Sequence, residues 1–304
     1  MVALELVPLG IILFFVALVG IIGNTIMVVV FFKFSKLRSP CHYFIMMTCL
    51  ADCCHNYGQL IFTVHLFGDF KTSQLVCSLI NIPTLIGVIS GSCWMLALGI
   101  DRFIACKWPI GYRSIISTST VYSIFQGLIP FTYTFVFLVM TFMEVDHTPV
   151  TCAVPLAMGS QTFVIWSISN IILNGIIMML YSIVNCFVQK QEHAQNFKTV
   201  FKSIFITISF VVAGWTITCI SNTIVVQFLP TPYGKQLLNM YAGIPVNIAC
   251  ASNVFIFYRI NQDYRSCIRK LSCCERAKVG VTYQANEGTK PSITPPFPSP
   301  DVNV

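Results

Sequence analysis

The 304-residue chain is 56% hydrophobic and 10% charged, with a mean hydropathy of +0.77. This composition excludes an ordinary soluble globular domain and indicates a membrane protein. The formal charge of +7 does not indicate nucleic-acid binding, because the basic residues are dispersed between apolar runs instead of forming a patch.

Seven segments with little or no charge are long enough to cross a membrane core of about 30 Å, which takes about 20 helical residues. They cover residues 6–32, 43–67, 75–103, 121–142, 161–188, 200–229 and 237–258. These runs lack the two-residue alternation of barrel strands, and helices satisfy their own backbone hydrogen bonds in lipid. The sequence therefore predicts an all-α membrane protein, a seven-transmembrane helix bundle.

The basic residues are distributed unevenly between the two sides of these segments. Of the 18 lysines and arginines, all but Lys71 and Lys235 lie at or beyond the end of the first, third, fifth or seventh segment. Positive residues near helix ends are retained in the cytoplasm. We therefore expect a multi-pass plasma-membrane protein with an extracellular N-terminus (residues 1–5), a bundle (6–271) and a cytoplasmic tail (272–304). The first segment lacks the features of a cleaved signal peptide.

The first two segments carry polar residues in their apolar interiors. Asn24 follows a glycine in the first segment, and Asp52 follows a Leu-Ala pair in the second. A carboxylate within the membrane needs polar partners, and Asn24 and Asn253 are the natural candidates. The competing interpretation is that Asp52 is a protonated packing residue with no role in function.

The third segment ends in a charge pair. No charged residue stands between Lys71 and Asp101, and Arg102 follows directly. Such a pair at the mouth of an apolar helix is expensive unless it faces water or protein, so we expect it to be functional. The alternative is that Arg102 only extends to the membrane interface, as arginines at helix ends do. Pro109 and Tyr112 follow in the next loop.

The stretch after the seventh segment is amphipathic. Residues 261–271 place apolar side chains at helical spacing with basic residues between them, which predicts a helix on the inner leaflet in contact with membrane lipids. Cys273 and Cys274 at its end are candidate palmitoyl acceptors. The rest of the tail has a disordered composition and is a candidate contact for an arrestin or a kinase.

These motifs resemble those of the rhodopsin-like G-protein-coupled receptors. In the seventh segment, residues 253–257 (Asn-Val-Phe-Ile-Phe) are similar to the Asn-Pro-x-x-Tyr sequence of that superfamily. Over about residues 20–271 the chain resembles the nematode serpentine receptors of class SX (Srsx). The residues that carry this closer resemblance are Asp52 with His55, Asp101-Arg102 with Pro109 to Arg113, and Asn253 with Asn261 and Tyr264-Arg265.

The resemblance implies a chemosensory receptor that binds a ligand outside and activates a heterotrimeric G protein inside. It also implies a disulfide between Cys77 and Cys152 that holds the outer loop over the bundle mouth. At rest Asp101 neutralises Arg102, and outward movement of the sixth helix frees the arginine. The residues implied in G-protein coupling are Asp101, Arg102, Pro109 and Tyr181. Those implied in the activation core are Asn24, Asp52, Trp215 and Asn253.

The later segments depart from the superfamily pattern. Ile217 stands where a proline is expected after Trp215, and the fifth segment has no proline, so kinks are not expected from proline at these places. Val254 and Phe257 replace the proline and tyrosine of the seventh segment. The hydroxyl of that tyrosine is either absent or supplied by Tyr258. This departure leaves open the alternative that the chain is a receptor-like scaffold that has lost G-protein coupling.

The resemblance also bears on the ligand. The position of the amine-binding aspartate falls on Thr84, and no lysine in the seventh segment is available for retinal. We therefore expect a neutral small molecule and no cofactor. The candidate pocket residues are Thr84, Val88, Trp215, Asn222, Gly243 and Asn247. Each of them has bundle packing as its alternative role.

Other functions are less well supported. The chain has no catalytic or phosphate-loop motif, and Cys53-Cys54-His55 is too compact to ligate one metal ion. Sodium binding at Asp52 is disfavoured because Gly91 occupies the serine position of the superfamily, although Ser90 and Ser92 flank it. The alternatives are a peptide or transmitter receptor of the same fold, or a secondary transporter that uses Asp52. The absence of an internal repeat argues against the transporter.

Overall fold

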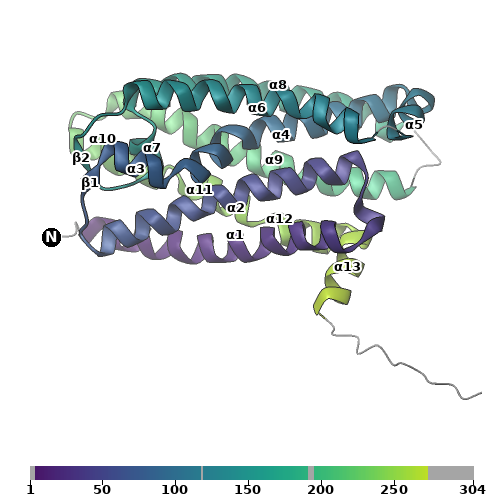
Figure 1. Ribbon diagram of the computed structural model, residues 1–304, viewed down its shortest axis with the longest axis horizontal. Helices are drawn as coiled ribbons and strands as arrows, with labels where there is room; N and C mark the ends of the chain where they lie inside the picture. The colour runs from purple at the N-terminus through teal and green to yellow at the C-terminus, as the bar shows by residue number, and fades with distance from the viewer. Residues whose placement is uncertain (1–3, 118, 191–194, 273–304) are drawn as a thin grey trace, which may run out of the picture.

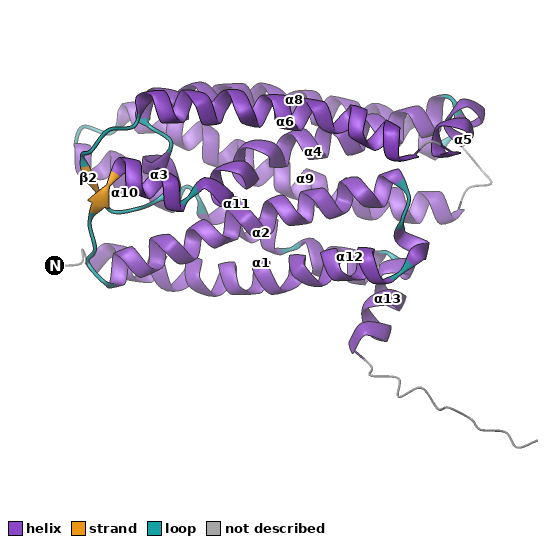
Figure 2. Ribbon diagram, in the orientation of Figure 1, coloured by secondary structure: helices purple, strands orange, loops and turns teal. Residues whose placement is uncertain are grey.

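A computed structural model describes residues 4–117, 119–190 and 195–272, and this part of the chain is almost entirely helical (Figure 2). Long helices lie side by side along the length of the molecule (Figure 1). They are α1 Val7–Lys33, α2 Pro40–Phe67, α4 Ile82–Lys107, α6 Ser119–Glu144, α8 Ser160–Gln189 and α9 Gln195–Thr223. A last column is formed by α10 Pro232–Tyr241, α11 Ile244–Ala251 and α12 Asn253–Ile260. Cys273, Cys274 and the tail lie outside the described residues.

Short elements close the two ends of the bundle. At the end near the N-terminus are β1 Thr72–Ser73, β2 Pro149–Val150, α3 Gln74–Ile80, α7 Val154–Ala157, η1 Leu4–Leu6 and η3 Val225–Phe228. At the opposite end are η2 Ser35–Leu37, α5 Pro109–Ser117 and α13 Gln262–Ser272 (Figure 1). The strands pair antiparallel, with Thr72 opposite Val150. We call these the β1 end and the α5 end.

Six helical stretches within the described ranges are long and apolar enough to cross a membrane. They are Val7–Lys33, Ile82–Lys107, Thr120–Glu144, Ser160–Gln189, Lys198–Thr223 and Tyr233–Ile260. The second predicted segment forms α2, which is 28 residues long but more polar. Its buried polar side chains are His42, Thr48, Asp52, His55, Asn56, Gln59 and Thr63. Because these groups face the bundle interior, α2 is buried among the other helices despite its composition.

Local sequence explains where several helices begin. A proline occupies the first turn of α1, α2, α4, α10 and α11, where its missing N–H costs no intrahelical hydrogen bond. At the start of α8 the carboxylate of Glu144, at the end of α6, accepts from the backbone N–H groups of Gln161 and Thr162, both at 2.7 Å. Gly159 precedes α8 with φ of 82°, a conformation that favours glycine.

Three predicted segments differ in their extent from the observed helices. The third, residues 75–103, is divided at Asn81 into α3 and α4. The sixth, residues 200–229, ends as an α-helix at Thr223 and continues as the 3₁₀ turn η3. The seventh is interrupted at Ala242 and Gly243, before α11, and again at Ser252. At Ser252 the backbone N–H donates to Ala249 O at 3.0 Å, a bond to the third preceding residue as in a 3₁₀ turn.

The core between the helices is close-packed, most tightly between α2 and α4. A Cβ atom on Gly87 of α4 would lie 2.3 Å from the carbonyl oxygen of Ala51 on α2, so only glycine allows these two backbones to approach. Small residues permit such contacts between membrane helices. This contact fixes α2 against α4 and places the polar face of α2 inside the bundle.

Candidate functional site

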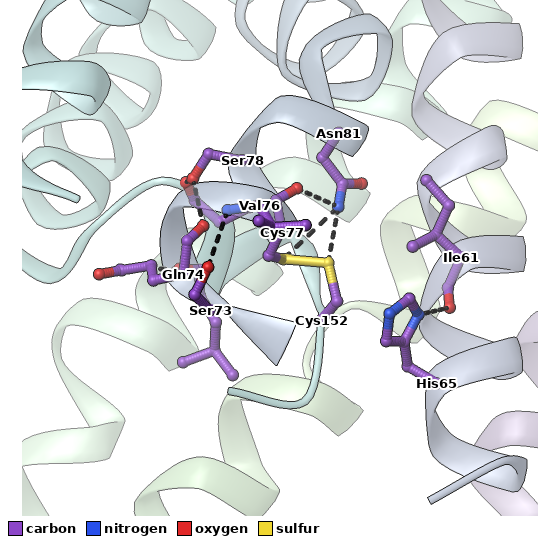
Figure 3. Close-up of a disulfide and its surroundings, with 11 residues drawn as sticks. Ile61, His65, Ser73, Gln74, Val76, Cys77, Ser78, Asn81 and Cys152 are labelled. Atoms are coloured by element: carbon purple, nitrogen blue, oxygen red, sulfur yellow. Dashed lines mark hydrogen bonds between the residues drawn. A yellow bond between two sulfur atoms is a disulfide. The ribbon is translucent and has the colours of Figure 1, made fainter. Parts of the chain in front are cut away.

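The β1 end is closed by the predicted disulfide, which the structure contains. Cys77 of α3 and Cys152 are bonded, and the amide of Asn81 donates to Cys152 Sγ at 3.0 Å (Figure 3). The segment after Cys152 is held by side chains of α3 as well. Ser78 Oγ donates to Ala157 O at 2.5 Å, and Gln74 Nε2 donates to Leu156 O at 2.9 Å. Covalent and polar contacts therefore fix α7 over this end.

A cavity lies beneath α7, between α1, α2, α4, α8, α9 and the α10–α11 column, and the empty space within it, part of which opens to solvent, is about 600 Å³. All the predicted pocket residues except Thr84 line it: Val88, Trp215, Asn222, Gly243 and Asn247. Thr84 does not line this cavity, because it is fully buried against Gly58, where a Cβ atom would lie 2.4 Å from Thr84 Cγ2.

The cavity wall also contains residues that the sequence analysis did not assign to it. His55 and Gln59 of α2 line it, as do Phe163 and Trp166 of α8. His55 is three residues after Asp52 and so lies on the same helical face, which was an available signal. Within the part of the chain that the structure describes, no Asp, Glu, Lys or Arg lines this cavity.

Trp215 lies between two of these polar aromatic residues. Its ring centroid is 5.5 Å from that of His55 and 5.4 Å from that of Trp166, both in edge-to-face geometry. Such pairs are stabilising and hold the rings in place. His55 Nε2 contacts Asn247 Oδ1 at 2.9 Å. The cavity therefore has a rigid aromatic wall with polar groups on each side of Trp215.

The middle of the bundle contains the predicted cluster around Asp52. Asn253 Nδ2 donates to Asp52 Oδ2 at 2.6 Å and to Asn24 Oδ1 at 2.9 Å. Asn24 Nδ2 in turn donates to Cys250 O at 3.0 Å. All three side chains are buried, so these bonds join α1, α2 and α12 where water does not compete. Trp215, the fourth residue predicted for the activation core, belongs to the cavity wall instead.

Sodium binding at Asp52, which the sequence disfavours, would require free oxygen atoms around this carboxylate. Ser92 Oγ donates to Asn170 Oδ1 at 2.7 Å, so it is engaged with α8. No group of three or more His, Cys, Asp or Glu with metal-binding geometry occurs in residues 4–117, 119–190 or 195–272. Asp52 Oδ2 and Asn24 Oδ1 accept hydrogen bonds from Asn253, whereas Asn253 Oδ1 has no partner among the described residues.

At the α5 end a buried ion pair forms a second polar cluster. Arg102 Nε and Nη2 both donate to Asp101 Oδ2, at 2.9 and 2.5 Å. The Tyr112 hydroxyl donates to Asp101 Oδ1 at 2.9 Å and accepts from Arg102 Nη2 at 2.9 Å. Asp101 is fully buried and Arg102 is 7% exposed. A buried pair is tolerated when its remaining polar atoms are satisfied, and Tyr112 of α5 contributes to this.

The other two residues predicted for coupling lie near this cluster. Pro109 is the first residue of α5 and so begins the helix that carries Tyr112. Tyr181 of α8 is fully buried, stacks on Phe201 of α9 and donates to Met95 O at 3.3 Å. The structure therefore has Arg102 paired with Asp101 and Tyr112, and Tyr181 bonded elsewhere.

The hydroxyl near the end of the seventh segment comes from α13. Tyr264 is 1% exposed and packs on Phe257 with ring centroids 5.0 Å apart. Its hydroxyl oxygen lies 3.2 Å from His42 Nδ1, within hydrogen-bond distance. From the sequence, this hydroxyl was expected either to be missing or to come from Tyr258. That residue is 37% exposed and accepts from Arg269 Nε at 3.2 Å, so its hydroxyl faces α13 and not the core.

Comparison with known proteins gives one family match and several relatives. Residues 17–272 match the family described as serpentine type 7TM GPCR chemoreceptor Srsx. The C-C chemokine receptor type 4 of Homo sapiens is 22% identical over 279 residues, which cover 83% of this chain and 74% of that receptor. The rhodopsin of Oryzias latipes is 21% identical over 302 residues, 88% of this chain and 80% of the rhodopsin. The neuropeptide Y receptor type 2 of Gallus gallus is 30% identical over 103 residues, 32% and 27% of the two chains.

Proposed function

Because the chain belongs to the Srsx family of serpentine seven-transmembrane G-protein-coupled receptors, we propose that it is a chemosensory receptor for a small neutral molecule. The ligand binds in the cavity beneath α7 and activates a heterotrimeric G protein at the α5 end. The cover of the cavity by α7 and the lack of formal charge among its described lining residues favour such a ligand over a peptide.

In this proposal α2 is the second of the seven membrane spans, in addition to the six apolar stretches. The concentration of lysine and arginine toward the α5 end supports an extracellular N-terminus and a cytoplasmic tail in the plasma membrane. Within α13, Cys267 and Ile268 pack against the bundle core while Arg269 and Lys270 are exposed. We place this helix at the inner leaflet, with these basic side chains toward the lipid headgroups. Palmitoylation of Cys273 and Cys274 and binding of an arrestin or a kinase to the tail remain part of the proposal.

The observation that carries the proposal is the closed cluster of Asp101, Arg102 and Tyr112. Arg102 is buried and held by two partners, which corresponds to a resting state in which it does not meet the G protein. Agonist must bind the active arrangement better than the resting one, since equal affinity shifts no population. Movement of α9 away from Tyr181 would then let Arg102 leave Asp101 and bind the G protein beside α5, which begins at Pro109.

The middle cluster connects the two ends in this mechanism. Asn253 and Asp52 join α12 to α2, and Asn24 joins both to α1. A ligand that moves Trp215 or Asn247 in the cavity shifts α9 or α11, both of which adjoin α12. Coupling of about 1–3 kcal/mol between the sites is typical of such systems and would be sufficient.

The test measures G-protein activation in cells that express wild type or Arg102→Ala, with fractionated small-molecule extracts and a panel of Gα subunits. We expect a response in wild type that disappears in Arg102→Ala at equal surface expression. Lys71→Ala is the control, because Lys71 is an exposed basic residue at the β1 end, away from the proposed G-protein contact, and should retain the response. An undiminished response in Arg102→Ala would contradict the proposed coupling.

The same cells distinguish a receptor from a secondary transporter. A transporter would show uptake that depends on Asp52 and not on Arg102, whereas a receptor signals through Arg102 without net uptake. Accumulation of labelled extract components in wild type and Arg102→Ala but not in Asp52→Asn would favour transport. A scaffold without G-protein coupling would bind ligand but would activate none of the Gα subunits tested.

A further inference from the structure

The cavity contains buried polar atoms that lack hydrogen-bond partners. His55 is 4% exposed, Trp166 2% and Asn222 6%, and all three line the cavity. Among the described residues no group pairs with His55 Nδ1, Trp166 Nε1 or Asn222 Oδ1. Buried polar atoms in proteins are usually paired, and an indole N–H in particular usually finds a partner. All three atoms belong to residues that line one cavity, so a small rotation of these side chains would let a bound molecule supply the missing partners.

The hydrogen bonds around Asn247 determine what His55 offers. Asn247 Nδ2 donates to Gly243 O at 2.7 Å, so the other amide atom facing His55 is the oxygen, an acceptor. His55 Nε2 lies 2.9 Å from this oxygen and must therefore carry the proton. In the neutral imidazole the other nitrogen, Nδ1, is then a hydrogen-bond acceptor. The chain thus fixes the tautomer through a residue of α11.

Trp166 offers the opposite polarity on the other side of Trp215. Its Nε1 carries a proton and is a donor only. Because the rings of His55 and Trp166 both contact Trp215 edge to face, the acceptor and the donor are separated by one indole. Asn222 Oδ1 provides a further acceptor. The space between them is bounded by aromatic and aliphatic side chains, including Phe163.

We infer that the ligand is a neutral aromatic compound that carries a hydroxyl or N–H donor for His55 Nδ1 and a separate carbonyl or ring-nitrogen acceptor for Trp166 Nε1. Its flat apolar body lies against Trp215. A carboxylate or an ammonium group is disfavoured, because burying a charge without a counter-charge is far more costly than burying a hydrogen-bonded neutral group. This inference rests on the proposed receptor function and makes its ligand class specific.

The test uses purified receptor in lipid nanodiscs and measures thermal stabilisation by four sets of small aromatic probes built on one scaffold. Hydroxyaryl ketones carry both groups, their methyl ethers carry only the acceptor, alkylphenols carry only the donor, and hydroxybenzoates are anionic. We expect the hydroxyaryl ketones to raise the unfolding temperature most. Loss of one neutral hydrogen bond should weaken binding about tenfold. The methyl ethers and the alkylphenols should therefore each bind about tenfold more weakly than the hydroxyaryl ketones.

Three variants separate the proposed contacts from structural effects. His55→Gln keeps a donor for Asn247 but removes the acceptor at Nδ1, whereas His55→Asn retains an acceptor near Nδ1 and loses the donor to Asn247. Trp166→Phe removes Nε1 and keeps an aromatic ring. We expect His55→Gln and Trp166→Phe each to bind the hydroxyaryl ketones about tenfold more weakly than wild type, and His55→Asn to bind them more tightly than His55→Gln. Each variant is first compared with wild type in unfolding temperature without probe, so that misfolding is recognised.

The inference is overturned if no probe set stabilises wild type, if the anionic or single-group probes bind as tightly as the hydroxyaryl ketones, or if both His55→Gln and Trp166→Phe bind these ketones like wild type. Because the assay measures binding without a G protein, it is independent of coupling. Probes that bind as expected but activate no Gα subunit would leave the ligand class standing and contradict the proposed function instead.

Discussion

At the β1 end His55 Nδ1, Trp166 Nε1 and Asn222 Oδ1 have no partner within the described residues. At the α5 end, by contrast, both carboxylate oxygens of Asp101 are hydrogen-bonded and Arg102 is held against them. A buried polar group without a partner costs about 1–3 kcal/mol. A molecule that supplies those partners therefore stabilises the β1 end, while opening the α5 end requires that satisfied bonds be broken. This difference suits a receptor, in which binding at one end must offset disruption at the other.

The largest expected effect concerns the cover of the β1 end. Replacing Cys77 and Cys152 together by serine removes a cross-link between residues 75 positions apart, which should cost about 4 kcal/mol of stability. The unfolding temperature of the purified protein should fall accordingly, and reductant should reproduce the effect in wild type. Cys186→Ser is the control, because Cys186 is an exposed free cysteine. An unchanged unfolding temperature in the double variant would mean that the polar contacts of α3 hold α7 without the disulfide.

The contrast between satisfied and unsatisfied groups can be tested with two asparagines that are both 1% exposed. Asn253→Ala removes the donor to Asp52 and Asn24, so it should destabilise the protein by about 1–3 kcal/mol. Asn174→Ala removes a side chain whose amide atoms both lack a partner in the described chain, so it should cost less. Thermal unfolding of both variants gives the comparison. Equal losses would show that packing, and not hydrogen bonding, determines the contribution of these residues.

A smaller effect is expected from loosening the α5 end without removing its charges. Tyr112→Phe deletes the hydroxyl that bonds both Asp101 and Arg102 and keeps the ring. A net loss of about 1 kcal/mol should favour release of Arg102 about fivefold. We therefore expect ligand-independent G-protein activation to rise several-fold at equal surface expression. Tyr57→Phe, on an exposed tyrosine, should leave the basal signal unchanged, and a basal signal in Tyr112→Phe no higher than wild type would contradict the resting role of the cluster.

The helical membrane architecture could be predicted from sequence because apolar run length is a local property. Helix ends were harder to predict. The sixth segment extended to residue 229 because Val225–Phe228 is as apolar as the helix before it, and hydropathy does not distinguish an α-helix from a 3₁₀ turn. The interruption at Ser252 was missed for a related reason, since no proline marks it and a change to a 3₁₀ backbone bond leaves the hydropathy unchanged.

The polar sites were predictable to different degrees. The disulfide and the Asp52 cluster followed from the resemblance, and the structure contains the disulfide and brings Asn24, Asp52 and Asn253 together. His55 and Trp166 were not assigned to the cavity because their proximity depends on how α2, α8 and α9 pack around Trp215. No spacing within one helix reports such a contact between three helices.

The smallest effect is expected from an exposed ion pair at the α5 end, in contrast to the buried pair of Asp101 and Arg102. Lys36 of η2 donates to Asp263 of α13 at 2.6 Å, with 68% and 35% of the two side chains exposed. The hydrogen bond and charge of Asp263 raise the pKa of Lys36 above its usual 10.5. Since the folded-state pKa is the higher one, the stabilisation is fully present below pH 10.5 and is lost as pH rises through the folded-state pKa.

An exposed ion pair of this kind contributes about 0.2–1 kcal/mol and is screened by salt. Lys36→Ala should therefore lower the unfolding temperature by no more than about 4 °C at low salt, with no change between pH 6 and 8 and a smaller effect in high salt. Lys33→Ala, at the end of α1, is the matched control. A loss in Lys36→Ala as large as that in Asn253→Ala would mean that α13 is held to η2 far more strongly than solvent-exposed charges allow, and that buried contacts such as Tyr264 with His42 depend on this pair.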